Sequence, residues 1–482
     1  MESIVERPTR IPEKVWESLS EDAQILMHGL CEEIRELKDL VRDLSARVKQ
    51  NSSNSSLPPS SDRPWDKPER KKKVRGRKRG GQKGHPPHVR QSFPPDRVQH
   101  VEEHYPTDCL HCSNSLGASN EEPDEPSVHQ VLDLPEIVPI VTEHRLHYRT
   151  CSHCKKRTRA ALPTGVSQSN FGPTVSALVA VLAVGFHLSK RQVKDLLQTL
   201  LNVDISLGAV IDAEKVASSA LAAPVGAVHE AMSHCNVVYQ DESKWPEAGK
   251  GGYVWVMASG PYAYYEIARS RGGEVARSLL GGPKFNGYSV TDRYAGYNCY
   301  PMERRGICHG HLIRDYQKIA DRSEEVKPIG KGLLKLEGTI FKAWHAFKEG
   351  KIDRPDLQQK LVDIAIPYEK FLRQGMAQDD SKVSGMCENI LGHWEAIWNF
   401  GWVEGMEPTN NEGERAVRHL VVWRKKCFGT QSASGSLFVA RMATVVETCR
   451  RQGINLLKFV GDAIRTHIAG ASPPSLIVAI SP

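Results

Sequence analysis

The chain has 482 residues, of which 40% are hydrophobic and 25% charged, and its formal net charge at pH 7 is +7. This composition is typical of globular proteins and excludes a chain too polar to form a core, while the length suits about three domains. No apolar segment follows a basic start, and the most apolar stretch, residues 175–188, is too short to cross a bilayer. We therefore expect a cytoplasmic protein without a membrane span.

Residues 1–50 are predicted to form a coiled-coil helix. Apolar side chains recur alternately three and four residues apart, as in the seam of a leucine zipper. The seam consists of Met27, Leu30, Ile34, Leu37, Val41, Leu44 and Val48. This pattern favours a dimer, although an amphipathic helix lying on the chain's own core would show the same polarity.

Residues 51–92 are predicted to be a linker that continues into a basic arm. The first part, NSSNSSLPPSSDRP, is rich in Ser, Asn and Pro and has too few apolar residues to fold. Residues 70–83 contain nine Arg and Lys and no acid, so their expected partner is a polyanion such as DNA. The predicted DNA contacts of the arm are Lys71, Lys72, Lys73, Arg75, Arg77, Lys78, Arg79 and Lys83.

Residues 93–165 contain two Cys-x-x-Cys pairs and are predicted to form a zinc-binding domain. The four cysteines are Cys109, Cys112, Cys151 and Cys154. Four thiolates are enough for a closed tetrahedral zinc site. The gap of 38 residues between the pairs exceeds the usual spacing, and His111 and His153, inside the pairs, are alternative ligands.

Residues 166–228 show helical periodicity, with one helix from about Ser189 and a second from about Ser206. Both serines are natural helix N-caps. Two helices joined by a tight turn are typical of a helix-turn-helix DNA-binding domain, but ordinary helical packing explains the pattern equally well.

Residues 229–470 are predicted to be a mixed α/β domain. A strand ending at Asp241 is followed by two strands in a meander, and later by a buried strand ending at Asp292. Strand ends bring together side chains from distant segments, and two carboxylates that meet there repel each other unless a cation lies between them. Magnesium commonly binds through one or two carboxylates together with phosphate oxygens.

The segment 407–429 contains a third candidate carboxylate. Asn411 and Glu414 have the spacing of a helix capping box, and Glu414 can also pair with Arg418 one turn later. Alternatively, Glu414 joins the two aspartates in a site for two divalent cations, and the basic residues after it bind phosphates. Those basic residues are Arg415, Arg418, Arg424, Lys425 and Lys426.

The order of these motifs resembles that of DDE transposases with the ribonuclease-H-like fold, in particular the TnpC-type transposase of the insertion-sequence sixty-six family. The matching segments span nearly the whole chain and are NSSNSSLPPSSD, GRKRGGQKGH, the two Cys-x-x-Cys pairs, DES, TDRYAGYN, CHGHLIRDY, NNEGERAVR and RKKCFG. The resemblance implies that Asp241, Asp292 and Glu414 are the catalytic residues and bind Mg²⁺ or Mn²⁺. Glu414 follows Asp292 by 122 positions, too far for a bare ribonuclease-H core, so we expect a helical insertion over about 325–400.

The chain departs from the family pattern at Ser243, where Thr is usual, and at His309, where an aromatic residue is usual. The second change leaves open how the segment around His311 packs. By resemblance, His311 is expected to make a polar contact near the acids or the DNA, and Arg314 to contact a phosphate.

Several neighbours of the acids have competing interpretations. Glu242 is predicted to point to the opposite strand face from Asp241 and to be structural. Glu412 is the alternative to Glu414 as third acid. Trp255 and Tyr297 are expected in the core. A soft metal site at Cys308, His309 and His311 is the less favoured interpretation of that segment.

The resemblance implies a DNA transposase of a bacterial insertion sequence, which binds element ends and carries out metal-dependent strand cleavage and strand transfer by in-line phosphoryl transfer. Its expected partners are terminal repeats and target DNA in the nucleoid, a second copy of itself or a higher synaptic oligomer, and companion proteins encoded by the same element. Residues 471–482 would be a tail. The alternatives are a non-catalytic zinc-containing DNA-binding regulator and a structure-selective nuclease of the same fold.

Overall fold

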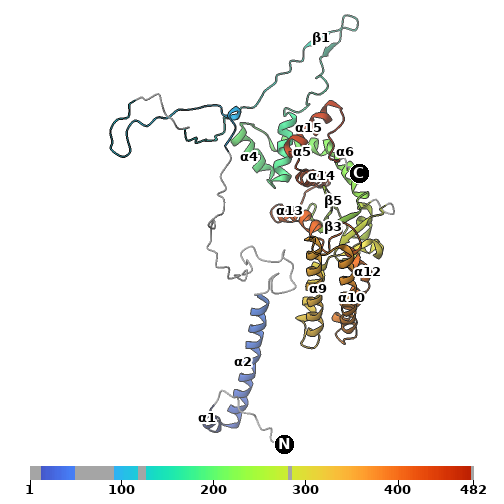
Figure 1. Ribbon diagram of the computed structural model, residues 1–482. Coiled ribbons are helices and arrows are strands. Elements are labelled where there is room, and N and C mark those ends of the chain that lie inside the picture. Colours follow the sequence, from blue (N-terminus) through green and yellow to red (C-terminus); the bar gives the residue numbers. More distant parts are fainter. Residues whose placement is uncertain (1–11, 49–91, 118–125, 281–284, 479–482) are drawn as a thin grey trace. The chain divides into compact units, whose positions relative to one another are not determined.

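The computed structural model describes residues 12–48, 92–117, 126–280 and 285–478 (Figure 1). The chain forms two compact units, a larger one of residues 1–68, 141–199 and 203–482 and a smaller one of residues 69–140 and 200–202. The basic residues predicted to contact DNA between Lys71 and Lys83 lie outside the described residues.

The larger unit contains a five-stranded mixed sheet. In chain order the strands are β3 (Val237–Lys244), β4 (Tyr253–Ser259), β5 (Tyr262–Ala268), β6 (Tyr288–Thr291) and β7 (Arg305–Ile307). Their spatial order is β5-β4-β3-β6-β7. The first three strands form an antiparallel meander, whereas β6 pairs in parallel with both β3 and β7. This arrangement agrees with the predicted mixed α/β sheet, and α7 (Gly273–Leu279) lies in the crossover before β6.

The strands are short and apolar because helices cover the sheet. All five residues from Val254 to Ala258 of β4 are fully buried, which requires packing on both faces of the strand. Helix α13 (Asn411–Cys427) packs against β3 and β4, and α14 (Ala433–Gln452) packs against β5.

Strand β3 does not end at Asp241, as predicted, but continues to Lys244. Its parallel pairing with β6 reaches Tyr239, whereas its antiparallel pairing with β4 extends to the pair Lys244–Tyr253. Beyond Tyr239, strand β3 therefore pairs with β4 alone, and Asp241 lies in this part of the strand.

Four helices separate β7 and α8 (His309–Ala320) from α13. They are α9 (Lys327–Lys348), α10 (Arg354–Met376), α11 (Ser381–Leu391) and α12 (Trp394–Trp398). Two begin at aspartate caps, because Asp353 accepts from the N–H of Asp356 and Asp380 from the N–H of Val383. Helices therefore occupy the region where the insertion is predicted.

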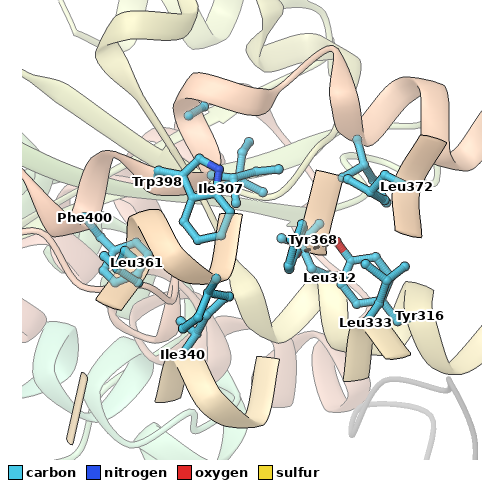
Figure 2. Packing of buried hydrophobic residues seen from close by; sticks show 14 of the residues in the cluster. Ile307, Leu312, Tyr316, Leu333, Ile340, Leu361, Tyr368, Leu372, Trp398 and Phe400 are labelled. Atoms are coloured by element: carbon cyan, nitrogen blue, oxygen red, sulfur yellow. Dashed lines mark hydrogen bonds between the residues drawn. The ribbon is translucent and has the colours of Figure 1, made fainter. Parts of the chain in front are cut away.

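These helices pack against the sheet through one hydrophobic cluster. It includes Ile307 of β7, Leu312 and Tyr316 of α8, Leu333 of α9 and Tyr368 of α10 (Figure 2). Since these side chains are almost completely buried, the helices share a core with the strands rather than forming an independently packed appendage.

A second group of helices precedes and follows the sheet in sequence. It consists of α3 (Pro173–Ala180), α4 (Lys190–Leu201), α5 (Leu207–Ala220), α6 (Ala222–Ser233) and α15 (Leu456–Ala469). Ser206 caps α5 by accepting from the N–H of Ala209 at 3.1 Å, and Ser189 exchanges hydrogen bonds with Gln192 at the start of α4. Helix α5 packs against α3, α14 and α15. A role for α4 and α5 in DNA binding remains a prediction.

The N-terminal part contains α1 (Glu13–Glu17) and the long helix α2 (Glu21–Val48). The apolar side chains of the seam from Met27 to Leu44 are exposed, from 37% at Met27 to 60% at Val41. Among the described residues, no helix combines the length and apolar character that a membrane crossing requires.

Candidate functional site

Three carboxylates from three elements lie near one another at the carboxyl-terminal end of the parallel pairing between β3 and β6. This end of the pairing is called the acidic edge below. Asp241 lies in β3, Asp292 directly follows β6, and Glu414 lies in the first turn of α13. Because β3 and β6 run in parallel, with Tyr239 opposite Val290, the residues that follow these positions emerge at the same edge.

Helix α13 can approach this edge because Gly413 has no side chain. A Cβ atom at Gly413 would lie 2.8 Å from Asn410 Oδ1 and 3.2 Å from the carbonyl carbon of Gln240, so only glycine fits without displacement. Asn410 strengthens the contact by donating its side-chain amide to the Gln240 carbonyl at 2.6 Å. This contact places Glu414 beside the strand that carries Asp241.

The predicted capping box of Asn411 and Glu414 is wrong. Helix α13 begins one residue earlier than the box requires, so Asn410 is the N-cap, and its side chain makes no capping hydrogen bond because it bonds to β3 instead. The Glu414 carboxylate faces His311, with 3.6 Å between Glu414 Oε1 and His311 Nδ1.

Several negative charges surround Asp241 at the acidic edge. Burial and the negative charges of Glu242, Asp292 and Glu414 raise the pKa of Asp241 well above its ordinary value. Asp241 Oδ1 accepts the N–H of Glu242 at 2.9 Å, and Asp292 Oδ1 accepts the N–H of Tyr294 at 2.8 Å. Divalent cations neutralise such clusters, and the all-oxygen donor set of the three acids fits Mg²⁺ or Mn²⁺.

Two neighbouring acids are occupied by other partners. The Glu242 side chain is buried and accepts hydrogen bonds from the Arg271 guanidinium and the Tyr297 hydroxyl. Glu412 pairs with Arg451 at 2.7 Å. Trp255 and Tyr297 are fully buried, as expected, and meet edge to face with 5.9 Å between ring centroids.

Helix α8 brings His311 and Arg314 to the same edge. Burial and the positive charge of Arg314 lower the pKa of His311, although Asp292 and Glu414 act in the opposite direction. The His311 imidazole is therefore harder to protonate than that of an ordinary exposed histidine. His309 points elsewhere, into the core, and is not part of this cluster.

The cations of α13 divide into two groups. Arg415, Arg418, Lys425 and Lys426 are exposed on the helix surface. Arg424 instead donates to Ser243 Oγ at 2.9 Å and to the carbonyl of Lys244, so it ties the end of β3 to α13.

These features lie within the segment that matches a known family. The family model described as "Transposase IS66 family" matches residues 168–436, more than half of the chain. The chain belongs to the IS66 transposase family. The match contains all three carboxylates of the sheet edge, the helices between β7 and α13, and the exposed cations of α13.

A second family model, the "zinc-finger binding domain of transposase IS66", matches residues 106–155 and includes both Cys-x-x-Cys pairs. This IS66 transposase therefore has a zinc-finger domain. A third model, a family of unknown function (DUF6444), matches residues 11–91, which include α2 and the basic arm.

Two proteins of Sinorhizobium fredii (strain NBRC 101917 / NGR234) are similar to the chain. The protein named "Uncharacterized protein y4hP" is 21% identical over 420 residues, covering 78% of this chain and 73% of its own length. The protein named "Uncharacterized protein y4qI" is 24% identical over 278 residues, covering 51% of this chain and 50% of its own length.

The two Cys-x-x-Cys pairs of the zinc-finger domain have the same local geometry. Cys109 N–H donates to the Asn114 carbonyl and Ser113 N–H to the Cys109 carbonyl; Cys151 N–H donates to Lys156 and Lys155 N–H to Cys151 in the same way. Ser113 and Lys155 both have positive φ values, of 59° and 56°. Strands β1 (Tyr148–Thr150) and β2 (Arg157–Arg159) flank the second pair.

Backbone N–H groups in these turns point at sulfur. The N–H groups of His111 and Cys112 lower the pKa of Cys109, and those of Cys154 and His153 lower the pKa of Cys151. Zinc binds cysteine as thiolate, so both turns are suited to it. The two pairs fall in the two different units.

Glu337, the residue that accommodates His309, was not predicted from the sequence. His309 Nδ1 lies 3.0 Å from Glu337 Oε2, and its Nε2 lies 3.0 Å from the Ile397 carbonyl. Tyr368 donates to Glu337 Oε1 at 2.7 Å. The family's usual aromatic residue at this position would need apolar surroundings. Here the start of α8 packs instead through the pairing of His309 with Glu337 of α9. The sequence signal was weak, because an isolated Glu in an amphipathic helix usually faces solvent.

Proposed function

We propose that this chain cuts DNA at the ends of a bacterial insertion sequence and joins the released 3′ hydroxyls to target DNA. The observation that carries the proposal is the convergence of Asp241, Asp292 and Glu414 at the acidic edge, where the half-buried Asp241 is surrounded by like charges. Such an arrangement is unfavourable without cations and therefore has a functional explanation rather than a structural one.

Each residue of the edge has a proposed role. Asp241, Asp292 and Glu414 would hold Mg²⁺ or Mn²⁺ next to the phosphodiester. Divalent cations bound there would activate the attacking oxygen and stabilise the leaving oxygen. His311 and Arg314 contact the phosphate next to the scissile bond, and Arg415, Arg418 and Lys425 contact the backbone farther along the DNA. Arg424 positions the end of β3.

The order and directions of the five strands support a ribonuclease-H-like fold for the domain. An antiparallel meander is followed by β6 and β7, which run parallel to β3, and β3 lies in the centre of the sheet. The helices α9–α12 would then be an insertion between the second and third acids.

The decisive experiment uses purified protein and labelled DNA that carries candidate element ends. We expect strand cleavage with Mg²⁺, none with EDTA, and joined products when target DNA is added. A protein that binds these ends but never cuts them would be a regulator instead. Hydrolysis without any joined product would identify a structure-selective nuclease.

The four cysteines are proposed to bind a single zinc ion. The purified protein should contain about one zinc per chain, and the double substitution Cys109→Ser with Cys151→Ser should remove it, because each substitution takes a thiolate from a different pair. Elemental analysis by mass spectrometry measures this loss. If the double variant keeps its zinc, or a zinc-free protein is folded and fully active, the assignment fails.

Helix α2 is proposed to pair with α2 of a second copy along its exposed apolar seam. Replacing Ile34 and Leu37 by Lys should convert a dimer into a monomer, since two charges at the seam would be buried without partners. Size-exclusion chromatography with light scattering gives the mass. Glu32→Lys, on the polar face of α2, should leave the dimer intact. The proposal would be contradicted if the wild-type protein were a monomer.

A further inference from the structure

Cys308, His311 and Glu414 form a cluster in which three different donor types face one another. One potential ligand atom from each residue lies within 4.8 Å of the other two. Cys308 is only 1% exposed and lies between the end of β7 and the start of α8, whereas His311 and Glu414 are partly exposed. The cluster therefore combines a buried sulfur with two donors that are partly accessible to solvent.

The cluster is held by contacts between the starts of two helices. The Asn410 N–H donates to Cys308 Sγ at 3.2 Å, and the His309 N–H donates to the Pro408 carbonyl at 2.9 Å. These bonds join the start of α8 to the segment before α13, so the three side chains come from positions that cannot easily move apart.

His311 has an unused ring nitrogen that faces the cluster. Its Nδ1 is buried and has no hydrogen-bond partner among the described residues, and Glu414 Oε1 lies 3.6 Å away. In a tetrahedral zinc site, with nitrogen and oxygen ligands at about 2.0–2.1 Å from the metal, two such atoms are about 3.3–3.4 Å apart. A shift of a few tenths of an ångström would bring these two ligands into place.

We propose that Cys308, His311 and Glu414 bind a borderline-soft divalent cation of the zinc and cobalt class, at a site separate from the zinc-finger cysteines. A sulfur, a nitrogen and an oxygen are the donors that such ions select, whereas Mg²⁺ requires oxygen ligands. When the metal–sulfur bond forms, the thiol proton is released to solvent. Three protein ligands leave a fourth position for water or a phosphate oxygen.

The site shares Glu414 with the proposed catalytic acids but not Asp241 or Asp292. Binding of the soft cation does not depend on the proposed transposase chemistry. If that chemistry is correct, the soft cation and Mg²⁺ compete for the Glu414 carboxylate, and zinc added during cleavage should reduce the rate.

Cobalt binding to the full-length protein tests the site, because thiolate ligands give Co²⁺ a charge-transfer absorption band. Metal-free wild-type protein is titrated with Co²⁺ without oxygen and compared with Cys308→Ala. We expect the variant to bind about one Co²⁺ fewer per chain and to show a weaker band. The zinc-finger cysteines contribute equally to both proteins and cancel in the difference.

Two further variants complete the design. Cys387→Ala removes an equally buried thiol on α11, far along the chain from the cluster, and should bind as much Co²⁺ as wild type. His311→Ala should also bind about one Co²⁺ fewer per chain. Because His311 is only partly buried, this variant should fold even if Cys308→Ala does not, and it then provides the comparison with wild type. Equal stoichiometry and equal spectra for wild type, Cys308→Ala and His311→Ala would overturn the proposal.

The outcome is distinguishable from that of the proposed function. Asp292→Asn keeps all three ligands and should show the same cobalt–thiolate absorption band as the wild type, whatever its effect on DNA cleavage. Cleavage by that variant would refute the catalytic assignment and leave the cobalt result unchanged.

Discussion

Asp292→Asn and Glu414→Gln should each reduce Mg²⁺-dependent strand cleavage by about 100-fold or more, while binding to element-end DNA changes little. Each substitution preserves the size of the side chain but removes a charged oxygen ligand from the acidic edge, and the loss of a single pre-organised charge-stabilising group typically costs that much. Cleavage of labelled end DNA under single-turnover conditions measures the rate, and gel shift measures binding.

Glu412→Gln is the matched control for this experiment. Glu412 lies on the same helical turn as Glu414, but its carboxylate is paired with Arg451. We expect this variant to cleave at nearly the wild-type rate. Wild-type cleavage by Asp292→Asn or Glu414→Gln, or a loss of cleavage confined to Glu412→Gln, would show that the acids have been assigned wrongly.

Glu337→Ala should destabilise the larger unit by about 3–5 kcal/mol, the usual cost of removing one partner from a buried charged pair. Both His309 and Glu337 are almost completely buried, and Tyr368 would also lose its acceptor. Chemical or thermal unfolding followed by circular dichroism measures the change. The exposed pair Glu369–Arg373 on α10 provides the control, since Glu369→Ala should cost less than about 1 kcal/mol.

The same pair makes stability depend on pH. Burial lowers the pKa of His309, but the charge of Glu337 and its hydrogen bond outweigh this effect and raise the pKa above its ordinary value of 6.5. The imidazolium therefore contributes stability that is fully present below about pH 6.5 and is lost as the pH rises through the folded-state pKa. The difference in unfolding free energy between wild type and Glu337→Gln should shrink over that range. A constant difference would mean that His309 stays neutral in the folded protein.

Much of the sheet could be predicted because its strands are short apolar runs bounded by turn residues. The strand YVWVMAS was located at the observed residues, 253–259. The end of β3 was predicted three residues too early, at Asp241 instead of Lys244. After Tyr239 the strand loses its pairing with β6 but keeps its pairing with β4, and no local sequence pattern indicates such a change of partners. Pairing partners far along the chain decide where a strand stops.

The local features of the candidate site were less predictable than its acids. The motif around Glu414 was recognisable, but the capping box was wrong because a bond from Asn410 to Gln240 across 170 residues replaced the local one. Similarly, Cys308 and Glu414 are distant in sequence, and only the contact between the starts of α8 and α13 brings them together. Side-chain contacts between remote segments cannot be derived from residue spacing.

The position of α9–α12 between Asp292 and Glu414 has a consequence for protein synthesis. The ribosome releases Asp241 and Asp292 long before it releases Glu414, and the helices made in the interval pack directly onto β7 and α8. A nascent chain can thus complete much of its core while its acidic edge still lacks one member. Until translation has passed α13, the growing polypeptide is unable to assemble the full set of three carboxylates.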